Sequence, residues 1–369
     1  MKANSQRTFF SPGRINLLGE HLDYNGGWVL PAAIDKGIYL KIVPQSERCE
    51  VRLEDGKQGY FHEKTELAKL PNWLRYPFGV WKEMKAQNSN IQGFIAELSA
   101  DLPTGAGLSS SAALCSVFAY ALNELYNCEL LKIDLALIAQ RVEHTYIGVN
   151  CGIMDQFAVL HGKENHVIKL QCADLQYEYF QIKTKNYAWI LVDTCVKHTL
   201  SDSPYNQRRA NCEKGLKEIK CVFPEISHLA LANISQLRVV SHKLSNEELM
   251  HCTYVIEEQN RVEKFVNALE NKDIDVVGTL LFETHDGLKN KYKVSCDEAD
   301  FLVDFARQDK RAKGARMMGG GFGGCTIHLV EEESTAAYSE AIATAYFNKF
   351  GIQPNIYSVK IGEGTREIL

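Results

Sequence analysis

The chain has 369 residues, of which 45% are hydrophobic and 24% are charged, and its formal net charge is −5. The length suggests one large or two medium domains, and the composition is typical of a folded globular protein and argues against a disordered chain. The slightly acidic balance, without a basic run, argues against nucleic acid or an anionic membrane as a partner. No segment approaches 18 consecutive apolar residues, so no membrane-spanning helix is expected.

Predicted elements alternate between strands and helices along the chain. Extended segments rich in β-branched and aromatic residues are expected within 28–53, and a strand at 93–103. Helical spacing of apolar residues follows at 109–125 and at 131–147. The later predictions are a buried strand at 187–196, helices at 206–220, 246–270, 296–309 and 333–349, a strand at 325–330 and a last strand at 356–361. This mixture predicts an α+β protein of two domains, taken as 1–185 and 186–369.

The cysteines and the first ten residues indicate the cellular compartment of the protein. Eleven cysteines are scattered from Cys49 to Cys325 and form no C-x-x-C pair. We interpret them as reduced, small hydrophobic side chains rather than as a disulfide framework. The opening MKANSQRTFF lacks the apolar core of a signal peptide. A cytoplasmic location is therefore expected.

A glycine-serine loop precedes the predicted helix at 109–125. The segment LPTGAGLSSSAAL, residues 102–114, has glycines that permit close backbone approach and serines where the helix begins. A helix N-terminus behind such a loop favours phosphate. The segment lacks the lysine of a Walker A motif, so charge neutralisation is expected from Mg²⁺. A capped helix after a flexible turn is the alternative interpretation of the loop taken alone.

Two further segments are rich in glycine, and the first of them also contains charged residues in an apolar stretch. Residues 11–31, SPGRINLLGEHLDYNGGWVLP, place Arg14, Glu20, His21 and Asp23 in an otherwise apolar stretch, where burying them is costly unless something binds them. Charged groups of this kind suit the hydroxyls of a sugar. Residues 317–330 contain five glycines between 319 and 324, which favours close approach to a ligand or to another segment. A polar turn and a hinge loop are the respective alternatives.

Together the three segments resemble the GHMP kinase family. Residues 13–25 match the galactokinase signature of that family almost throughout, with Leu18 in place of the usual isoleucine. Further similar stretches lie at 141–157, at 196–213 and around Tyr292. The resemblance implies an N-terminal domain like ribosomal protein S5 domain 2, a ferredoxin-like C-terminal domain and an active site in the cleft between them. It also implies transfer of the γ-phosphate of ATP to the C1 hydroxyl of galactose by an enzyme that is a monomer.

The resemblance assigns roles to matching positions. Asp155 is implied to take the proton from the sugar's C1 hydroxyl, with Arg14 paired to it, although Asp155 as a group that mainly orients the hydroxyl stays open. Sugar-binding positions are Glu20, His21, Asp23, Gly152 and Tyr205. ATP-binding positions are Pro103, Gly105, Ala106, Gly107, Leu108, Ser109, Ser110 and Ser111, together with Trp73. The implied Mg²⁺ ligands are Ser111 and Glu143; without the resemblance, Glu143 would be interpreted as a solvated helix residue.

Two alternatives to this function remain at the level of sequence. The same fold could serve another sugar, such as N-acetylgalactosamine or arabinose, since the chain departs from the usual pattern near Pro204 and near 286–287. A non-catalytic galactose and ATP sensor is the other alternative, but such sensors are altered in the serine-alanine segment that is intact here at 109–113. The neighbouring Arg208 and Arg209 could help to bind phosphate, although paired arginines on a helix more often form surface ion pairs.

Overall fold

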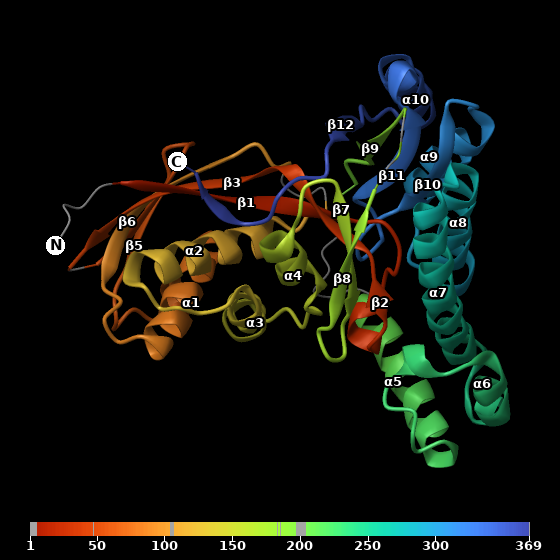
Figure 1. Cartoon of the computed structure of the whole chain (residues 1–369), viewed down its shortest axis with the longest axis horizontal. Helices are drawn as coiled ribbons and strands as arrows, with labels where there is room; N and C mark the ends of the chain where they lie inside the picture. Colours follow the sequence, from red (N-terminus) through yellow and green to blue (C-terminus); the bar gives the residue numbers. More distant parts are fainter. Residues whose placement is uncertain are drawn as a thin grey trace.

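Figure 1 shows two layered regions side by side, each with a sheet covered by helices. The structure is a computed structural model that describes residues 6–46, 48–103, 107–182, 184, 186–196 and 204–368, without the side chains of residues 204 and 205. The first region holds most of the first half of the chain, and the second holds most of the second half. The mixed architecture confirms the predicted α+β class.

A six-stranded sheet with the order β13-β1-β3-β6-β4-β5 forms the first region. Its strands are β1 (Arg7–Asn16), β3 (Pro31–Gln45), β4 (Cys49–Leu53), β5 (Gln58–Phe61), β6 (Gly93–Ala100) and β13 (Arg366–Ile368). All neighbours are antiparallel except β4 and β6. The helices of this region are α1 (Asn72–Gln87), α2 (Ser110–Tyr126), α3 (Lys132–Val142) and α4 (Met154–His161), and they lie on one side of the sheet.

The second region is an antiparallel four-stranded sheet with the order β10-β11-β9-β12. Its strands are β9 (Tyr187–Asp193), β10 (Ala312–Met317), β11 (Cys325–Glu331) and β12 (Asn355–Val359). The helices α8 (Ile274–Gly287), α9 (Asp297–Gln308) and α10 (Thr335–Phe350) contact this sheet. The long helix α7 (Asn246–Asn271) packs on α8 and, on another side, on α5 (Pro204–Val222).

Smaller elements join the two regions. A three-stranded sheet orders β2 (Trp28–Val29), β7 (His166–Gln171) and β8 (Tyr177–Gln181), and the short helix α6 (Ile234–Val240) packs on α5 and α7. Single π-helical turns extend α3 at η3 (Glu143–Ile147) and α8 at η7 (Leu288–Tyr292). Short 3₁₀ turns are η1 (Asp23–Asn25), η2 (Leu67–Lys69), η5 (Leu229–Leu231), η6 (Ser241–Lys243) and η8 (Glu332–Ser334).

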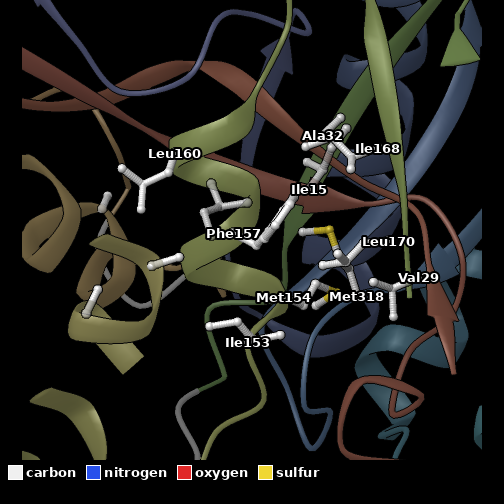
Figure 2. Close-up of a cluster of buried hydrophobic side chains, with 14 of the residues drawn as sticks. Ile15, Val29, Ala32, Ile153, Met154, Phe157, Leu160, Ile168, Leu170 and Met318 are labelled. Carbon is white, nitrogen blue, oxygen red and sulfur yellow. The ribbon is translucent and has the colours of Figure 1, made fainter. Parts of the chain in front are cut away.

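Helix α4 is anchored in the hydrophobic core beside the first sheet. Figure 2 shows Met154 and Phe157 among side chains from β1, β2, β3 and β7, with Met318 from the glycine-rich segment next to them. Phe157 is fully buried and Met154 nearly so. Because these two neighbours fix the helix by packing, the orientation of Asp155 between them is fixed as well.

The predicted elements with strong local patterns are present. The helices at 109–125, 246–270 and 296–309 correspond to α2, α7 and α9, and α10 ends as expected where Gly351 adopts a φ of 70°. The chain contains helices and strands that the sequence analysis missed, including β1 and α1. Pro12 and Gly13 interrupt the alternation of β1, and Pro77 lies inside α1. Proline and glycine are unfavourable inside strands, and proline is unfavourable inside helices, so the sequence did not indicate either element.

The prediction that residues 356–361 form the last strand is wrong. Strand β12 lies there, but the chain continues to β13, which pairs antiparallel with β1 through Thr8 and Ile368. A three-residue strand is too short to show an alternating pattern, and its partner comes from the opposite end of the chain. Among the described residues, no helix is both long and apolar enough to cross a membrane.

Candidate active site

The three glycine-rich segments meet at one place. Arg14 of β1 donates its backbone N–H to the carbonyl of Leu108 at 3.2 Å and its Nη1 to the carbonyl of Gly107 at 2.7 Å. Gly319 of the third segment lies against the same loop, since a Cβ placed on it would be 3.9 Å from the Gly107 oxygen. A Cβ on Gly13 would lie 2.9 Å from the Leu108 oxygen, so this glycine serves close approach between the first two segments. The place where the three segments meet is the candidate site.

Arg14 and Asp155 form a bidentate ion pair at the centre of the site. Nε of Arg14 donates to Oδ1 of Asp155 at 2.8 Å and Nη2 to Oδ2 at 3.0 Å. The Arg14 side chain is only 6% exposed, whereas that of Asp155 is 28% exposed and accessible to a ligand. Burial lowers the pKa of Arg14, but the charge and hydrogen bonds of Asp155, together with the charges of Glu20 and Asp23, more than offset this, so the pKa is raised and the guanidinium stays charged.

Ser109 gives Asp155 a third partner. Its hydroxyl donates to Oδ2 of Asp155 at 2.5 Å. The residue adopts a left-handed φ of 59°, which is unusual for a side chain larger than glycine, and it does not cap α2 with its hydroxyl. Asp155 lies in the first turn of α4, where Ile153 occupies the N-cap position. The Asp155 carboxylate is therefore not a helix cap, because it binds side chains of other segments.

Glu143 and Ser111 come together beside this pair. The Ser111 hydroxyl donates to Oε2 of Glu143 at 3.2 Å, and Nε2 of Gln156 donates to Oε1 at 2.8 Å. Glu143 is buried, so the interpretation as a solvated helix residue would have been wrong. Burial raises the pKa of Glu143 to about 7, and the charge of Asp155 adds to the rise.

These oxygens fit a divalent cation. The Glu143 carboxylate contacts the Ser111 hydroxyl near Asp155, and a bound cation would offset the burial and the Asp155 charge that raise the pKa of Glu143. Hard oxygen donors of this kind suit Mg²⁺, which keeps waters and phosphate oxygens as its other ligands. In the described part of the chain, no group of three or more His, Cys, Asp or Glu side chains is arranged to hold a metal by itself. A site completed by a nucleotide's phosphates agrees with both observations.

Glu20 and His21 lie on the turn after β1. Glu20 is 3% exposed, and its Oε1 accepts a hydrogen bond from the backbone N–H of Gly319 at 2.8 Å. His21 adopts a φ of 64° and forms a hydrogen bond between Nδ1 and the Tyr24 hydroxyl at 2.8 Å. Burial lowers the pKa of His21 to about 3, and the charge of Arg208 lowers it further, so the imidazole is neutral.

Asp23 packs directly against Gly152. A Cβ placed on Gly152 would lie 2.0 Å from Oδ2 of Asp23, so only glycine leaves room for that carboxylate. Burial raises the pKa of Asp23 to about 7, with a further contribution from the Asp155 charge. Both residues line a cavity of about 530 Å³, whose wall also includes Tyr24, Asn150 and Arg209. Among the described residues, the lining of this cavity does not include Arg14, Glu20, His21 or Asp155, so the cavity lies beside the ion pair rather than around it.

Some predicted site residues are not brought into this cluster. Gly105, Ala106 and the side chain of Tyr205 lie outside the described residues. Pro103 is half-buried before the loop, Leu108 is buried beneath it, and Ser110 begins α2. Trp73, at the start of α1, packs its indole over Gly59 of β5, so its assignment to adenine depends on the resemblance alone.

Sequence analysis missed other residues that contact the site. Gln156 holds Glu143, and its position next to Asp155 in a matched segment was a signal that could have found it. Arg316 contacts Glu20 from β10, where it directly precedes the third glycine-rich segment. Tyr254 of α7 also contacts the Glu20 turn, and nothing in its sequence surroundings indicates this role.

Comparison with known families agrees with this fold and site. Residues 75–163 match the model of the GHMP kinase N-terminal domain, and residues 265–348 match the model of the GHMP kinase C-terminal domain. Residues 2–44, which include Arg14 and Glu20, match the galactokinase galactose-binding signature. Fold and site together thus define a GHMP-type small-molecule kinase.

Individual relatives narrow the family. The chain is 39% identical to the galactokinase of Thermotoga maritima, over 97% of this chain and 99% of that protein. It is 38% identical to the galactokinase of Clostridium beijerinckii, over 99% and 95% of the two chains. The structure of Lactococcus lactis galactokinase complexed with galactose superposes with a TM-score of 0.93 at 31% identity, covering 99% and 95% of the chains. The chain belongs to the galactokinase family.

A more distant structure shows how far the fold extends. The Methanococcus jannaschii mevalonate kinase has a TM-score of 0.70 at 20% identity, covering 98% and 99% of the chains. At this identity the likeness concerns the fold alone.

Proposed function

We propose that this protein is a galactokinase, which transfers the γ-phosphate of ATP to the C1 hydroxyl of galactose. The observation that carries the proposal is the cluster of Arg14, Asp155 and Ser109 at the glycine-serine loop. The accessible carboxylate of Asp155 lies beside the N-terminus of α2, which is suited to phosphate. Phosphoryl transfer to an alcohol requires such a pair, one group at the acceptor oxygen and one site for the phosphates. The galactose complex of the L. lactis relative supports galactose as the acceptor.

Asp155 acts on the acceptor oxygen. Arg14 and Ser109 hold the carboxylate by three hydrogen bonds, so its orientation is set before the sugar arrives. The carboxylate accepts the proton of the C1 hydroxyl as the new O–P bond forms. Arg14 also contacts the Gly107 carbonyl, so it couples the position of Asp155 to the phosphate loop. Its positive charge favours the negative charge that develops between the acceptor and the phosphate.

Ser111 and Glu143 would hold Mg²⁺. The cation, when bound with ATP, neutralises phosphate charge that this loop cannot neutralise with a lysine. Gln156 keeps one oxygen of Glu143 in place while Ser111 contacts the other. Glu143 would hold the cation in its ionised form, which a bound positive charge would favour over the neutral form that burial favours.

Glu20, His21, Asp23 and Gly152 would form the sugar site. Carboxylates accept hydrogen bonds from hydroxyls, and a neutral imidazole can donate or accept one. Tyr205 and Trp73 keep their proposed places beside the sugar and adenine. The two domains are proposed as 1–185 and 186–369, with the site in the cleft between them. A cytoplasmic monomer is proposed, and the eleven free thiols support a reducing compartment.

Measurement of ADP release tests this function. The purified protein is given Mg-ATP with galactose, N-acetylgalactosamine, glucose, mannose, arabinose or fucose. Turnover is expected to be highest with galactose and to fall about 10²–10⁴-fold in Asp155→Asn. Asp55→Asn, which changes an exposed carboxylate in the β4–β5 turn, is the matched control and should keep full activity.

Each other outcome has a distinct meaning. If another sugar gives the highest turnover, the kinase mechanism stands and the proposed acceptor is wrong. If no sugar gives turnover although galactose and ATP bind in calorimetry, the protein is a sensor. If Asp155→Asn keeps wild-type turnover, the role assigned to Asp155 is wrong.

A further inference from the structure

The sugar-binding candidate Glu20 is held by residues from the far end of the chain. Arg316 on β10 is fully buried, and its Nη1 and Nη2 each lie 3.2 Å from Oε1 of Glu20. The backbone N–H of Gly319 donates to the same oxygen at 2.8 Å. All three hydrogen bonds have Oε1 as the acceptor, and no hydrogen bond from a described residue ends on Oε2. The other oxygen, Oε2, is therefore the one that can receive a hydroxyl of the sugar.

Arg316 also holds the backbone on which Glu20 is carried. Its Nε donates to the carbonyl of Leu17 at 2.7 Å, and Nη2 donates to the carbonyl of Asn16. One planar guanidinium thus spans the end of β1 and the Glu20 carboxylate at once. Lysine has a single ammonium group and cannot reproduce this spacing, so the arrangement depends on the shape of arginine as well as on its charge.

Helix α7 fixes the same turn from a second direction. The Tyr254 hydroxyl donates to the Glu20 carbonyl at 3.0 Å, and Oε1 of the buried Glu258 accepts the backbone N–H of Gly19 at 2.8 Å. Gly19 has a φ of 93°, and a Cβ there would lie 2.7 Å from the Trp28 carbonyl. Only glycine adopts this φ freely and leaves room for the Trp28 carbonyl, and the two hydrogen bonds from α7 hold the turn in this shape.

We propose that Arg316 and Tyr254 are positioning residues of the sugar site, which act through Glu20 although they are buried and do not touch the sugar. Arg316 fixes the carboxylate, and Tyr254 fixes the peptide that carries it. The proposal rests on the proposed galactokinase function. It predicts that conservative changes at these positions weaken galactose binding selectively, because the nucleotide is bound by the separate loop at 103–111.

Steady-state kinetics of Arg316→Lys and Tyr254→Phe test the proposal. The KM for galactose is expected to rise about tenfold in Arg316→Lys and about threefold in Tyr254→Phe, since each loses hydrogen bonds to the Glu20 turn. The KM for ATP should stay within about twofold, because the hydrogen bonds of Arg316 and Tyr254 do not end on the described residues of the loop, 103 and 107–111. Galactose binding measured by calorimetry should weaken by the same factors. Tyr254→Phe removes one oxygen only, so it decides the question if Arg316→Lys does not fold.

A matched control separates positioning from general stability. His328 on β11 is fully buried like Arg316 and lies beside β10, but its partners are Thr326 and Tyr338. His328→Gln should lower the melting temperature and leave both KM values unchanged. In a Glu20→Gln background, Arg316→Lys should add little to the loss of galactose affinity, because both changes act on one contact.

Three results would overturn the proposal. The first is an unchanged galactose KM in Tyr254→Phe and in folded Arg316→Lys while the wild type phosphorylates galactose. The second is an equal rise in both KM values, which would indicate a general loss of structure. The third is full additivity of Arg316→Lys with Glu20→Gln. A wild-type protein that neither turns over nor binds galactose would overturn the proposed function together with this inference.

Discussion

The contact between Gly152 and Asp23 allows a sharp prediction for Gly152→Ala. The added methyl group would lie 2.0 Å from Oδ2 of Asp23 and 2.6 Å from its Cγ. The carboxylate must therefore move by about 1 Å, a displacement that can cost a hundredfold where groups must be aligned. Gly152 does not have a positive φ, so alanine fits the backbone itself. The perturbation thus falls on the carboxylate rather than on the fold.

The expected effect follows from the bond that Asp23 would lose. A hydrogen bond from a sugar hydroxyl to a carboxylate contributes about 1.5–3 kcal/mol, which corresponds to about a 10- to 150-fold rise in the KM for galactose. The free energy of unfolding should change by less than about 1 kcal/mol, because the loss of chain entropy in the unfolded state offsets the displaced side chain. Steady-state kinetics with each substrate varied separately, and a thermal melt, measure both quantities.

Gly362→Ala is the matched control for this prediction. Its added methyl group would meet its nearest neighbours at 3.4–3.5 Å, and Gly362 also has no positive φ. Both KM values should stay at the wild-type level in this variant. The reasoning is refuted if Gly152→Ala keeps the galactose KM within twofold of the wild type, or if the KM for ATP rises in parallel. Asp23→Asn should reproduce the galactose defect independently.

Two further changes test other parts of the structure. Ser109→Ala removes the hydroxyl that donates a hydrogen bond to Asp155 at 2.5 Å. The kcat should therefore fall about tenfold or more, while the melting temperature changes little. An unchanged kcat would show that Arg14 alone orients Asp155. Burial lowers the pKa of His328 to about 3, below the unfolded value of about 6.5, so its contribution to stability is present above pH 6.5 and is lost as the pH falls. Between pH 6.5 and 5, urea denaturation should show the wild type losing about 1.6 kcal/mol more than His328→Gln, and parallel losses would contradict the assignment.

Local sequence determined much of the secondary structure. The helices α2, α7 and α9 repeat apolar residues at helical spacing, and α10 stops at a glycine that adopts a left-handed φ. The glycine clusters predicted close backbone approach to a ligand or to another segment, with a hinge loop as the alternative for 317–330. Gly19 and Gly321 meet the first expectation, since a Cβ on them would lie 2.7 Å from the Trp28 oxygen and 2.2 Å from the Val294 oxygen, respectively.

The sequence patterns did not predict which charged residues are buried. Arg208 and Arg209 are neighbours on α5 and look alike in sequence. In the structure Arg209 forms the expected exposed ion pair with Glu213, whereas Arg208 is buried and donates to the carbonyls of Tyr292 and Lys293. Glu143 is likewise buried, although it lies at the end of an amphipathic helix. Exposure depends on what packs against a helix, and that information lies elsewhere in the chain.

The sequence by itself determined the family resemblance, the chemical types of the site residues and the loops that carry them. The resemblance had implied the pairing of Arg14 with Asp155. Tertiary structure alone decided other contacts: Ser109 with Asp155 across 46 positions, Glu20 with Arg316 across 296, and β13 with β1 at opposite ends of the chain. Periodicity records only which side of a helix or strand is apolar, over a few turns. The contacts that orient these carboxylates join segments that are far apart in the sequence. Which side chains meet there depends on the entropy lost in closing long loops and on how the segments pack in one common core.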